Sequence, residues 1–329
     1  MAGPISNDIL ISVVIPVKDG DYWLEEVLGG LMKQTLIDRA EVIVIDSGST
    51  DRTLEIVSRF PVRLVQIAPA EFNHGSTRNL GVMLAKGEYV VMTVQDAKAA
   101  DDRWLQKLLD GFDAPDVAGV CGQQIVPHDP DKNPAVWFRP VSPPTVDRYH
   151  FADPAEFDRL SPEEKRWVCR WDNVNAMYRR EVLLRVPFRA VAFAEDALWA
   201  KDALLSGYTI VYHTAARVLH YHFETPDFAF RRSFTVSYHF YQIFGLRPSP
   251  AATGLIPILR TVRLLMKAKG IGLKDRYKWL LYNYRWSRAI NRSVTIFNRA
   301  LGAGAKELDR VHADICGIPP QAVKPSSVL

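Results

Sequence analysis

The first 125 residues alternate between short apolar runs and segments with helical spacing. Four runs rich in β-branched residues are typical of strands, and they cover residues 11–17, 42–45, 63–67 and 89–93. The first run is continuous enough for a strand that is buried on both faces. Helical patterns lie between the runs, at 22–33, 51–60 and 76–85. Strands that alternate with helices over short connections predict a mixed, mainly parallel α/β sheet with helices on both faces.

The pattern changes in the second half of the chain. Residues 127–170 form a long excursion rich in proline, aspartate and aromatic residues, with one clear helix start at the capping box Ser161-Pro162-Glu163-Glu164. Regular structure resumes at 173–178, with a helix at 195–206 and strands near 209–212 and 218–222. From Asp227 the spacing is helical. We therefore predict an α/β domain over residues 1–226, a helical region over 227–316 and a flexible tail over 317–329.

Charge is distributed unevenly along the chain. The net charge is +4, yet residues 251–300 hold eleven Lys or Arg and one acid, while residues 1–250 carry a net charge of −6. This division is typical of a catalytic body with an extension that binds a polyanion or a membrane. The apolar runs are far shorter than the ~20 residues of a membrane span, and no secretory signal is recognisable. Three scattered cysteines indicate reduced thiols in a cytosolic protein.

Polar side chains follow the predicted strands at their carboxyl ends, where ligands bind in parallel sheets. Asp46 ends the second strand, where its carboxylate could accept a hydrogen bond from the imide N–H of uracil or thymine. The alternative is that the Ser, Gly and Thr residues of this turn only cap the next helix. Asp96 follows the fourth strand too early to cap the next helix, which favours a divalent-cation ligand. His220 and His222 share one face of a strand, either as a packed pair or as further ligands.

Two other segments carry groups suited to catalysis. Glu195 and Asp196 open a helix after an apolar loop, so they are favoured by the helix dipole and are also candidates for a general base with a raised pKa. The octapeptide 72–79 precedes a helix, and Arg78 beside the helix N-terminus would attract phosphate. Neither a dinucleotide-binding glycine motif nor a P-loop occurs.

These motifs, in this order, resemble those of glycosyltransferase family 2, which has the GT-A fold, and in particular its bacterial rhamnosyltransferase-like branch. The resemblance spans roughly residues 12–244. It is carried by residues 13–18, 46–51, 93–97, 173–176 and 193–196, by His220-Tyr221-His222, and by Phe72-Asn73-His74-Gly75-Ser76-Thr77-Arg78-Asn79. It implies an inverting transfer of a sugar from a nucleoside diphosphate donor.

The resemblance also implies roles for single residues. Asp196 would be the catalytic base, with Glu195 as its neighbour and the less favoured base. Asp96 would bind Mg²⁺ or Mn²⁺ together with His220, or else His222. The predicted donor-binding set consists of Pro16, Lys18, Asp46, Ser49, His74, Arg78, Asn79 and Gln95. The chain departs from the family's Asp-x-Asp motif because Gln95-Asp96-Ala97 offers a single carboxylate, which leaves strict metal dependence open.

Acceptor recognition is predicted at Trp171, Asp172 and Asn173, where the indole could stack on a sugar or be buried in the core. Further along, residues 255–299 are amphipathic. One apolar face contains Ile258, Leu259, Val262, Leu265 and Met266, and another contains Trp279, Tyr282, Trp286, Ile290 and Phe297. Cationic faces beside these predict binding to an anionic membrane surface. The alternative is a set of packed helices with a solvated basic rim.

Together these features predict a rhamnosyltransferase at the cytoplasmic face of the membrane. It would use dTDP-L-rhamnose and a glycan or polyprenyl-diphosphate-linked acceptor, with no nucleic-acid partner. Three alternatives remain at this point. The chain could use another UDP-, dTDP- or GDP-sugar, it could be a nucleotidyltransferase, or it could be an inactive membrane- or nucleic-acid-binding protein. A nucleotidyltransferase would need a Gly- and Arg-rich loop after the first strand, which the chain lacks.

Overall fold

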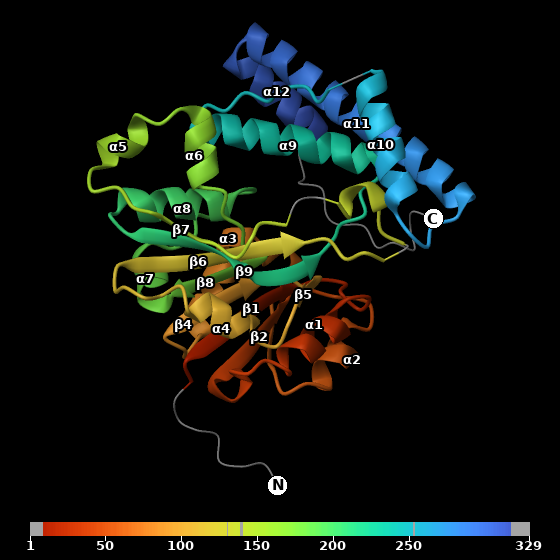
Figure 1. Cartoon of the computed structure of the whole chain (residues 1–329). Helices are drawn as coiled ribbons and strands as arrows, with labels where there is room; N and C mark the ends of the chain where they lie inside the picture. Colours follow the sequence, from red (N-terminus) through yellow and green to blue (C-terminus); the bar gives the residue numbers. More distant parts are fainter. Residues whose placement is uncertain (1–8, 130, 139–140, 253, 317–329) are drawn as a thin grey trace. The chain divides into compact units, whose positions relative to one another are not determined.

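We analysed the protein as a computed structural model (Figure 1). The structure describes residues 9–129, 131–138, 141–252 and 254–316, so the predicted tail at 317–329 lies outside the described residues. The chain divides into two compact units. The first consists of Met1–Ile125 and Val141–His220, and the second of Val126–Pro140 and Tyr221–Leu329. Each unit has its own hydrophobic core.

The first unit is built on one sheet, which has nine strands within the described residues (Figure 1). The strands lie in the order β3-β2-β1-β4-β8-β6-β9-β5, and β7 pairs with β9. They are β1 (Ile11–Val17), β2 (Ala40–Asp46), β3 (Arg63–Gln66), β4 (Tyr89–Thr93), β5 (Ala97–Ala99), β6 (Val117–Ile125), β7 (Val146–Tyr149), β8 (Asn175–Arg179) and β9 (Thr209–His220).

Strand directions confirm the predicted mixed, mainly parallel sheet. β1 pairs in parallel with β2 and β4, β2 with β3, and β6 with β9. β8 runs antiparallel between β4 and β6, and the short strands β5 and β7 run antiparallel to β9. The two strands predicted near 209–212 and 218–222 are one strand, β9, in which His213 pairs with β7 and Arg217 with β6 across an irregularity in the β6 ladder.

Helices cover both faces of this sheet. They are α1 (Leu24–Leu31), α2 (Thr53–Ser58), α3 (His74–Leu84), α4 (Trp104–Leu109), α5 (Pro154–Asp158), α6 (Pro162–Val168), α7 (Arg180–Arg185) and α8 (Glu195–Leu205), with 3₁₀ turns η1 (Ile37–Arg39) and η2 (Pro69–Glu71). The predicted capping box at the start of α6 is confirmed, because Ser161 and Glu164 each accept the other's backbone N–H.

Alternation along the central strands sets the two faces. Val13 and Ile15 of β1 point to the side on which α1, α2 and α4 pack. Val14 points to the other side, where Gly81 of α3 comes so close that an added Cβ would lie 2.4 Å from Val14 Cγ1. Every residue of β1 except Pro16 is fully covered, as predicted for a strand buried on both faces.

The second unit is helical. It contains η3 (Pro134–Val136), α9 (Pro226–Phe244), α10 (Leu255–Lys267), α11 (Leu273–Ala303) and α12 (Ala305–Cys316). One core forms where α9, α11 and α12 meet, around Phe234 and Phe297, and Tyr238 and Tyr241 of α9 pack against it. A smaller core joins Trp137 to Ala268 and Ile271. None of the helices within the described residues combines the length and apolarity needed to cross a bilayer.

Candidate active site

The predicted site residues of the first unit gather at one edge of the sheet. β1, β2 and β4 end there at Val17, Asp46 and Thr93, the antiparallel β8 begins there, and β9 ends there at His220. Topology therefore collects side chains that are far apart in sequence, as the carboxyl-end rule predicts.

Asp46 closes the turn that follows β2. Its carboxylate is fully buried and accepts hydrogen bonds from the backbone N–H groups of Gly48 and Ser49 and from the Ser49 hydroxyl. The Ser49 hydroxyl in turn accepts the N–H of Asp19, which ties this turn to the end of β1. Both side chains therefore serve the turn, and their contact with a nucleobase stays a prediction.

The side chain of Gln95 forms hydrogen bonds with the backbone that follows β1. Its side-chain carbonyl accepts the Lys18 N–H at 2.8 Å, and its amide group donates to the Lys18 carbonyl at 3.0 Å. The side chain thus imitates one rung of a β-ladder, which a carboxylate could not do because it has no donor.

Asp96 and His220 face each other across this edge. His220 Nε2 lies 3.4 Å from Asp96 Oδ1, and both side chains are almost fully buried. His220 Nδ1 lies 2.7 Å from Gln124 Oε1, an acceptor, so Nδ1 carries the proton in that contact. The opposite nitrogen and the carboxylate are then two acceptors directed at each other, which requires a proton or a cation between them. A carboxylate oxygen and an imidazole nitrogen are both common ligands of divalent cations.

His222 follows His220 by two residues, at the beginning of the second unit. Two residues of chain keep its Cα within about 7 Å of the His220 Cα. It stays a predicted third ligand.

Glu195 is locked in a buried ion pair. Its Oε1 lies 2.9 Å from Arg78 Nη1 and accepts a hydrogen bond from Asn173 Nδ2 at 3.1 Å. Burial alone would raise the pKa of Glu195, but the charges of Arg78 and His74 and the hydrogen bond from Asn173 hold it below its usual value. Glu195 is therefore a stable carboxylate.

Asp196, the next residue, has the opposite electrostatics. Burial raises the pKa of Asp196 to about 7, and the negative charges of Glu195 and Asp172 raise it in the same direction. In the described structure its carboxylate accepts one hydrogen bond, from the Ala197 N–H at 2.7 Å. A carboxylate that exchanges its proton near pH 7 has the property required of a general base.

The backbone before this acidic pair is unusual. Ala194, which precedes Glu195, has φ 63°, and Asp19, after β1, has φ 47°; they are the non-glycine residues with positive φ in the described chain. Such conformations cost on the order of 1 kcal/mol and concentrate at functional sites. Both lie beside the edge of the sheet where the polar residues gather.

The octapeptide 72–79, most of which forms the beginning of α3, holds the loop that leads to the acidic pair. Asn79 donates to the Phe188 carbonyl and accepts its N–H, and Asn73 donates to the Val191 carbonyl while capping α3. Gly75 lies so close to this loop that a Cβ would be 2.0 Å from the Arg189 carbonyl oxygen. Contacts of His74, Arg78 and Asn79 with a diphosphate stay predictions, because Arg78 and Asn79 are engaged within the protein.

The predicted acceptor residues separate into two environments. Trp171 is only 3% exposed, packs against Trp199 and Tyr212, and donates to the Tyr178 hydroxyl. Trp171 is therefore part of the core, and its ring is not available for the predicted stacking on a sugar. Asn173 is also buried and holds Glu195.

Asp172 interacts electrostatically with both His220 and Asp196. Burial raises its pKa, the charge of His220 opposes that rise, and its own charge raises the pKa of Asp196. The sequence interpretation missed Arg166 on α6, whose guanidinium lies within electrostatic range of both Asp172 and Asp196. Asp196, Asp172 and the Asp96–His220 pair thus form one electrostatically linked group.

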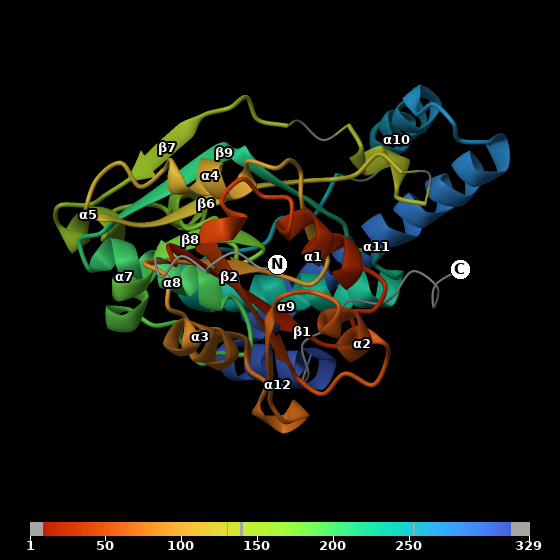
Figure 2. The same ribbon diagram turned by 90° about the horizontal axis from the view of Figure 1, so that it is seen from below.

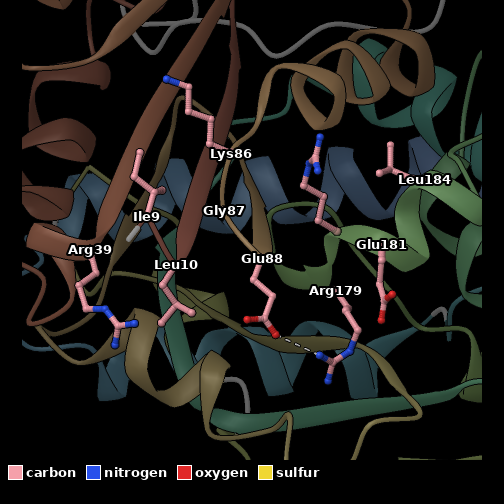
Figure 3. Close-up of a pocket in the computed structure, with 10 residues that line it drawn as sticks. Ile9, Leu10, Arg39, Lys86, Gly87, Glu88, Arg179, Glu181 and Leu184 are labelled. Atoms are coloured by element: carbon pink, nitrogen blue, oxygen red, sulfur yellow. Dashed lines mark hydrogen bonds and ion pairs between the residues drawn. The ribbon is translucent and has the colours of Figure 1, made fainter. Parts of the chain in front are cut away.

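A separate cavity of the first unit lies away from these residues. It has a volume of about 630 Å³ and is lined by Ile9, Leu10, Arg39, Lys86, Gly87, Glu88, Arg179, Arg180, Glu181 and Leu184 (Figure 3). These residues precede β1, β2 and β4 or follow β8, so the cavity lies at the amino edge of the parallel strands, opposite the acidic residues. Glu88 and Arg179 pair with each other there, at 3.3 Å.

Comparisons with known proteins agree with this architecture. Two O-antigen chain rhamnosyltransferases of Salmonella are similar in sequence. RfbN of Salmonella typhimurium is 32% identical over 232 residues, covering 68% of this chain and 70% of that protein. WbaN of Salmonella anatum is 32% identical over 203 residues, covering 59% of this chain and 61% of that protein, which is less than two thirds of its length.

Solved structures share the fold at low identity. The mannosyltransferase PcManGT from Pyrobaculum calidifontis, solved with GDP-Man and Mn²⁺, has a TM-score of 0.50 and 19% identity, covering 92% of this chain and 78% of that one. Glucosyl-3-phosphoglycerate synthase from Mycobacterium tuberculosis has a TM-score of 0.50 and 17% identity, covering 74% and 83%. The family model for Glycosyl transferase family 2 matches residues 12–185. The chain therefore belongs to glycosyltransferase family 2, in its rhamnosyltransferase-like branch, and has the GT-A fold.

Proposed function

We propose that the protein transfers L-rhamnose, with inversion, from dTDP-L-rhamnose to a hydroxyl group of a glycan or lipid-linked acceptor in the assembly of a cell-surface polysaccharide. The observation that carries the proposal is the pair of adjacent acids on α8. Glu195 is fixed by Arg78, whereas Asp196 has a pKa of about 7 and is linked through Asp172 to the Asp96–His220 pair. The similarity to two rhamnosyltransferases supports the choice of sugar.

The chemistry follows from the placement of these groups. Asp196 accepts the proton of the acceptor hydroxyl while that oxygen forms a bond to the anomeric carbon, and the bond from this carbon to the diphosphate oxygen breaks on the opposite face. Such a base contributes about 10²–10⁴-fold to the rate. A divalent cation bound by Asp96 and His220, with His222 as a candidate third ligand, would supply positive charge against the departing diphosphate.

Glu195 takes a positioning role in this proposal. Its negative charge helps to keep the pKa of Asp196 high, and its ion pair with Arg78 fixes the first turn of α8. Asp196 is thus a stronger base than an exposed aspartate, while its neighbour cannot exchange a proton in the same pH range.

We also propose that transfer takes place at the cytoplasmic face of the cell membrane. The +10 balance of residues 251–300 supports this location, and a lipid-linked acceptor would be found there. Nucleic acid is not part of the proposal.

A donor screen tests the proposed function. Purified protein with Mn²⁺ or Mg²⁺ and a membrane lipid extract is incubated with dTDP-L-rhamnose and with UDP- and GDP-sugars, and labelled lipid products are measured. We expect transfer from dTDP-L-rhamnose, lost in Asp196→Asn, and thermal stabilisation by dTDP that depends on Mn²⁺ and is lost in Asp96→Asn. Transfer from another sugar nucleotide alone would retain the transferase and reject the rhamnosyl assignment, and no transfer with any donor would reject the function.

A further inference from the structure

Two helices of the second unit carry apolar side chains on their solvent side. α10 and the first half of α11 lie next to each other (Figure 2). On α10 only Leu265 is buried among the residues that the structure describes. The exposed large apolar side chains of this pair of helices are Leu255, Ile256, Ile258, Leu259, Met266, Leu273, Tyr277 and Tyr284. An apolar cluster of this size on a surface marks an interaction site.

Six of the exposed side chains of α10 form two strips, while Ile256 falls inside the arc of the basic strip and Ile258 lies outside both. At 100° per residue, Leu255, Leu259 and Met266 fall within about 40° of one another. Arg260, Arg263 and Lys267 occupy an arc of about 60° directly beside them. All six are exposed. The helix therefore presents an apolar strip and a basic strip side by side to solvent.

α11 repeats the same arrangement. Leu273, Tyr277 and Tyr284 fall within about 40° of one another, and Lys274, Lys278, Arg285 and Arg288 occupy the neighbouring arc of about 80°. Leu273 is 81% exposed and Tyr277 is 70% exposed. We name the exposed apolar and basic side chains of both helices, over residues 255–288, the α10–α11 strip.

The Trp-rich face predicted from the sequence is a different face. Trp279 is 4% exposed and Phe297 is fully buried, and Trp286 donates its indole N–H to Glu224 within the same unit. That face packs inward, as the packed-helix alternative expected. The membrane prediction can therefore rest only on the α10–α11 strip.

Hydrogen bonds and apolar packing fix the turn between α10 and α11. Arg276 donates to the backbone carbonyls of Ile271, Met266 and Ala268, and so fixes the turn between α10 and α11. Ala268 and Ile271 are buried against Trp137. The apolar side chains are thus displayed by an anchored corner, and their exposure does not result from a detached helix.

The basic side chains of the strip form no ion pairs within the described residues. Within the described residues, Arg260, Arg263, Lys274 and Lys278 have no carboxylate within ion-pair distance, and Asp275 is the one acid between residues 251 and 300. This density of positive charge opposes contact with a second copy of the same surface, and lysine is depleted in the centre of protein interfaces. The phosphates of a lipid surface neutralise this positive charge, and the boundary between headgroups and acyl chains accommodates leucine and tyrosine side chains.

We propose that the α10–α11 strip docks on an anionic lipid bilayer, with the apolar strip in the acyl boundary and the basic strip against lipid phosphates. This inference rests on the proposed function in one respect, since it supplies the surface through which the enzyme reaches a lipid-linked acceptor. Docking itself requires neither donor nor acceptor, and it is measured without them.

Vesicle sedimentation tests the proposal with the full chain. Vesicles of phosphatidylcholine alone are compared with vesicles of phosphatidylcholine and phosphatidylglycerol. We expect binding to the anionic vesicles that weakens with salt. Leu259→Glu/Leu273→Glu should lower the partition coefficient at least about tenfold, because two exposed side chains lose their transfer free energy. Arg260→Gln and Lys274→Gln should each lower it about fivefold.

Met83→Glu is the matched control, since Met83 is 67% exposed on α3 in the other unit and its replacement should leave binding unchanged. Equal binding by wild type and the double variant would overturn the proposal. So would a wild-type dimer that the double variant converts to monomers, or RNA binding in place of vesicle binding. Loss of transfer from dTDP-L-rhamnose with vesicle binding intact would instead reject the proposed function and retain the docking surface.

Discussion

Two regions of this protein contain many charged side chains, which are buried and paired in one region and exposed to solvent in the other. Around α3 and α8, Arg78 and Glu195 are buried together, and each polar group is placed by a partner from a distant part of the chain. Along the α10–α11 strip, the basic residues are exposed and have no acidic partner within the described residues. Buried charge must be paired because the interior cannot solvate it, whereas exposed charge can remain available for a ligand. The first arrangement indicates internal positioning and the second indicates recognition.

Replacing Asp196, the proposed base, should have the largest effect on catalysis. Asp196→Asn keeps the shape of the side chain but cannot accept the proton, so kcat should fall by about 10²–10⁴-fold. Binding of dTDP, followed by calorimetry, should stay within a factor of about two of wild type, because Asp196 contacts no donor group in the proposed mechanism. Asp102→Asn, an exposed carboxylate on the same unit, serves as the control. A kcat within tenfold of wild type would show that another group is the base.

Breaking the buried ion pair should have the largest effect on stability. Arg78→Met leaves Glu195 charged and buried, and we expect the free energy of unfolding to fall by about 3–5 kcal/mol. Arg189→Met breaks a pair with Asp202 in which the arginine is 56% exposed, and it should cost about 1 kcal/mol or less. Adding Glu195→Gln should recover part of the loss at Arg78. Urea unfolding of the four proteins measures these differences, and equal losses at the two arginines would remove the contrast between the regions.

Asp196 should also give a pH dependence with a defined sign. The rate with the proposed donor should fall about tenfold per pH unit below pH 7, because the base is protonated there. Stability should change in the opposite direction. An acid whose pKa is raised from 3.8 to about 7 on folding contributes stability that is fully present below about pH 4 and lost as the pH rises through 7.

At pH 8 Asp196→Asn should therefore be more stable than wild type, by on the order of 2 kcal/mol, and this advantage should disappear near pH 4. Chemical unfolding at the two pH values measures it. A constant difference between the proteins across this range would show that residue 196 has an ordinary pKa.

Much of the fold could be predicted from the sequence because its signals are local. Each buried parallel strand is a continuous apolar run, and the polar residue that ends it marks the functional edge of the sheet. β5 and β7 have three and four residues and partly exposed side chains, so they carry no comparable signal. Their position depends on β9, to which both pair.

The roles of single side chains depend on partners that are distant in sequence, and there local patterns were insufficient. Trp171 was compatible with a sugar-stacking role until Trp199 and Tyr212 were seen to enclose it. α11 carries two apolar strips, and its sequence alone cannot show that the tryptophan strip packs inward while Leu273 and Tyr277 remain outside. Arg166 was missed because its guanidinium joins the site from α6, inside the excursion at 127–170.

Gln95 gives the smallest expected effect and a sharp test of internal positioning. Gln95→Glu can still accept the Lys18 N–H but cannot donate to the Lys18 carbonyl, so one hydrogen bond is lost and two acceptors face each other. We expect a loss of about 1–2 kcal/mol in the free energy of unfolding.

Because Lys18 is predicted to line the nucleobase site, the KM for the donor should rise a few-fold in Gln95→Glu while kcat stays the same. The control is Gln66→Glu, an exposed position on β3. Gly20 lies close to this side chain, since a Cβ there would be 2.9 Å from Gln95 Oε1. If both variants behave alike, the amide at position 95 does not hold the backbone at Lys18 in a conformation that matters for donor binding.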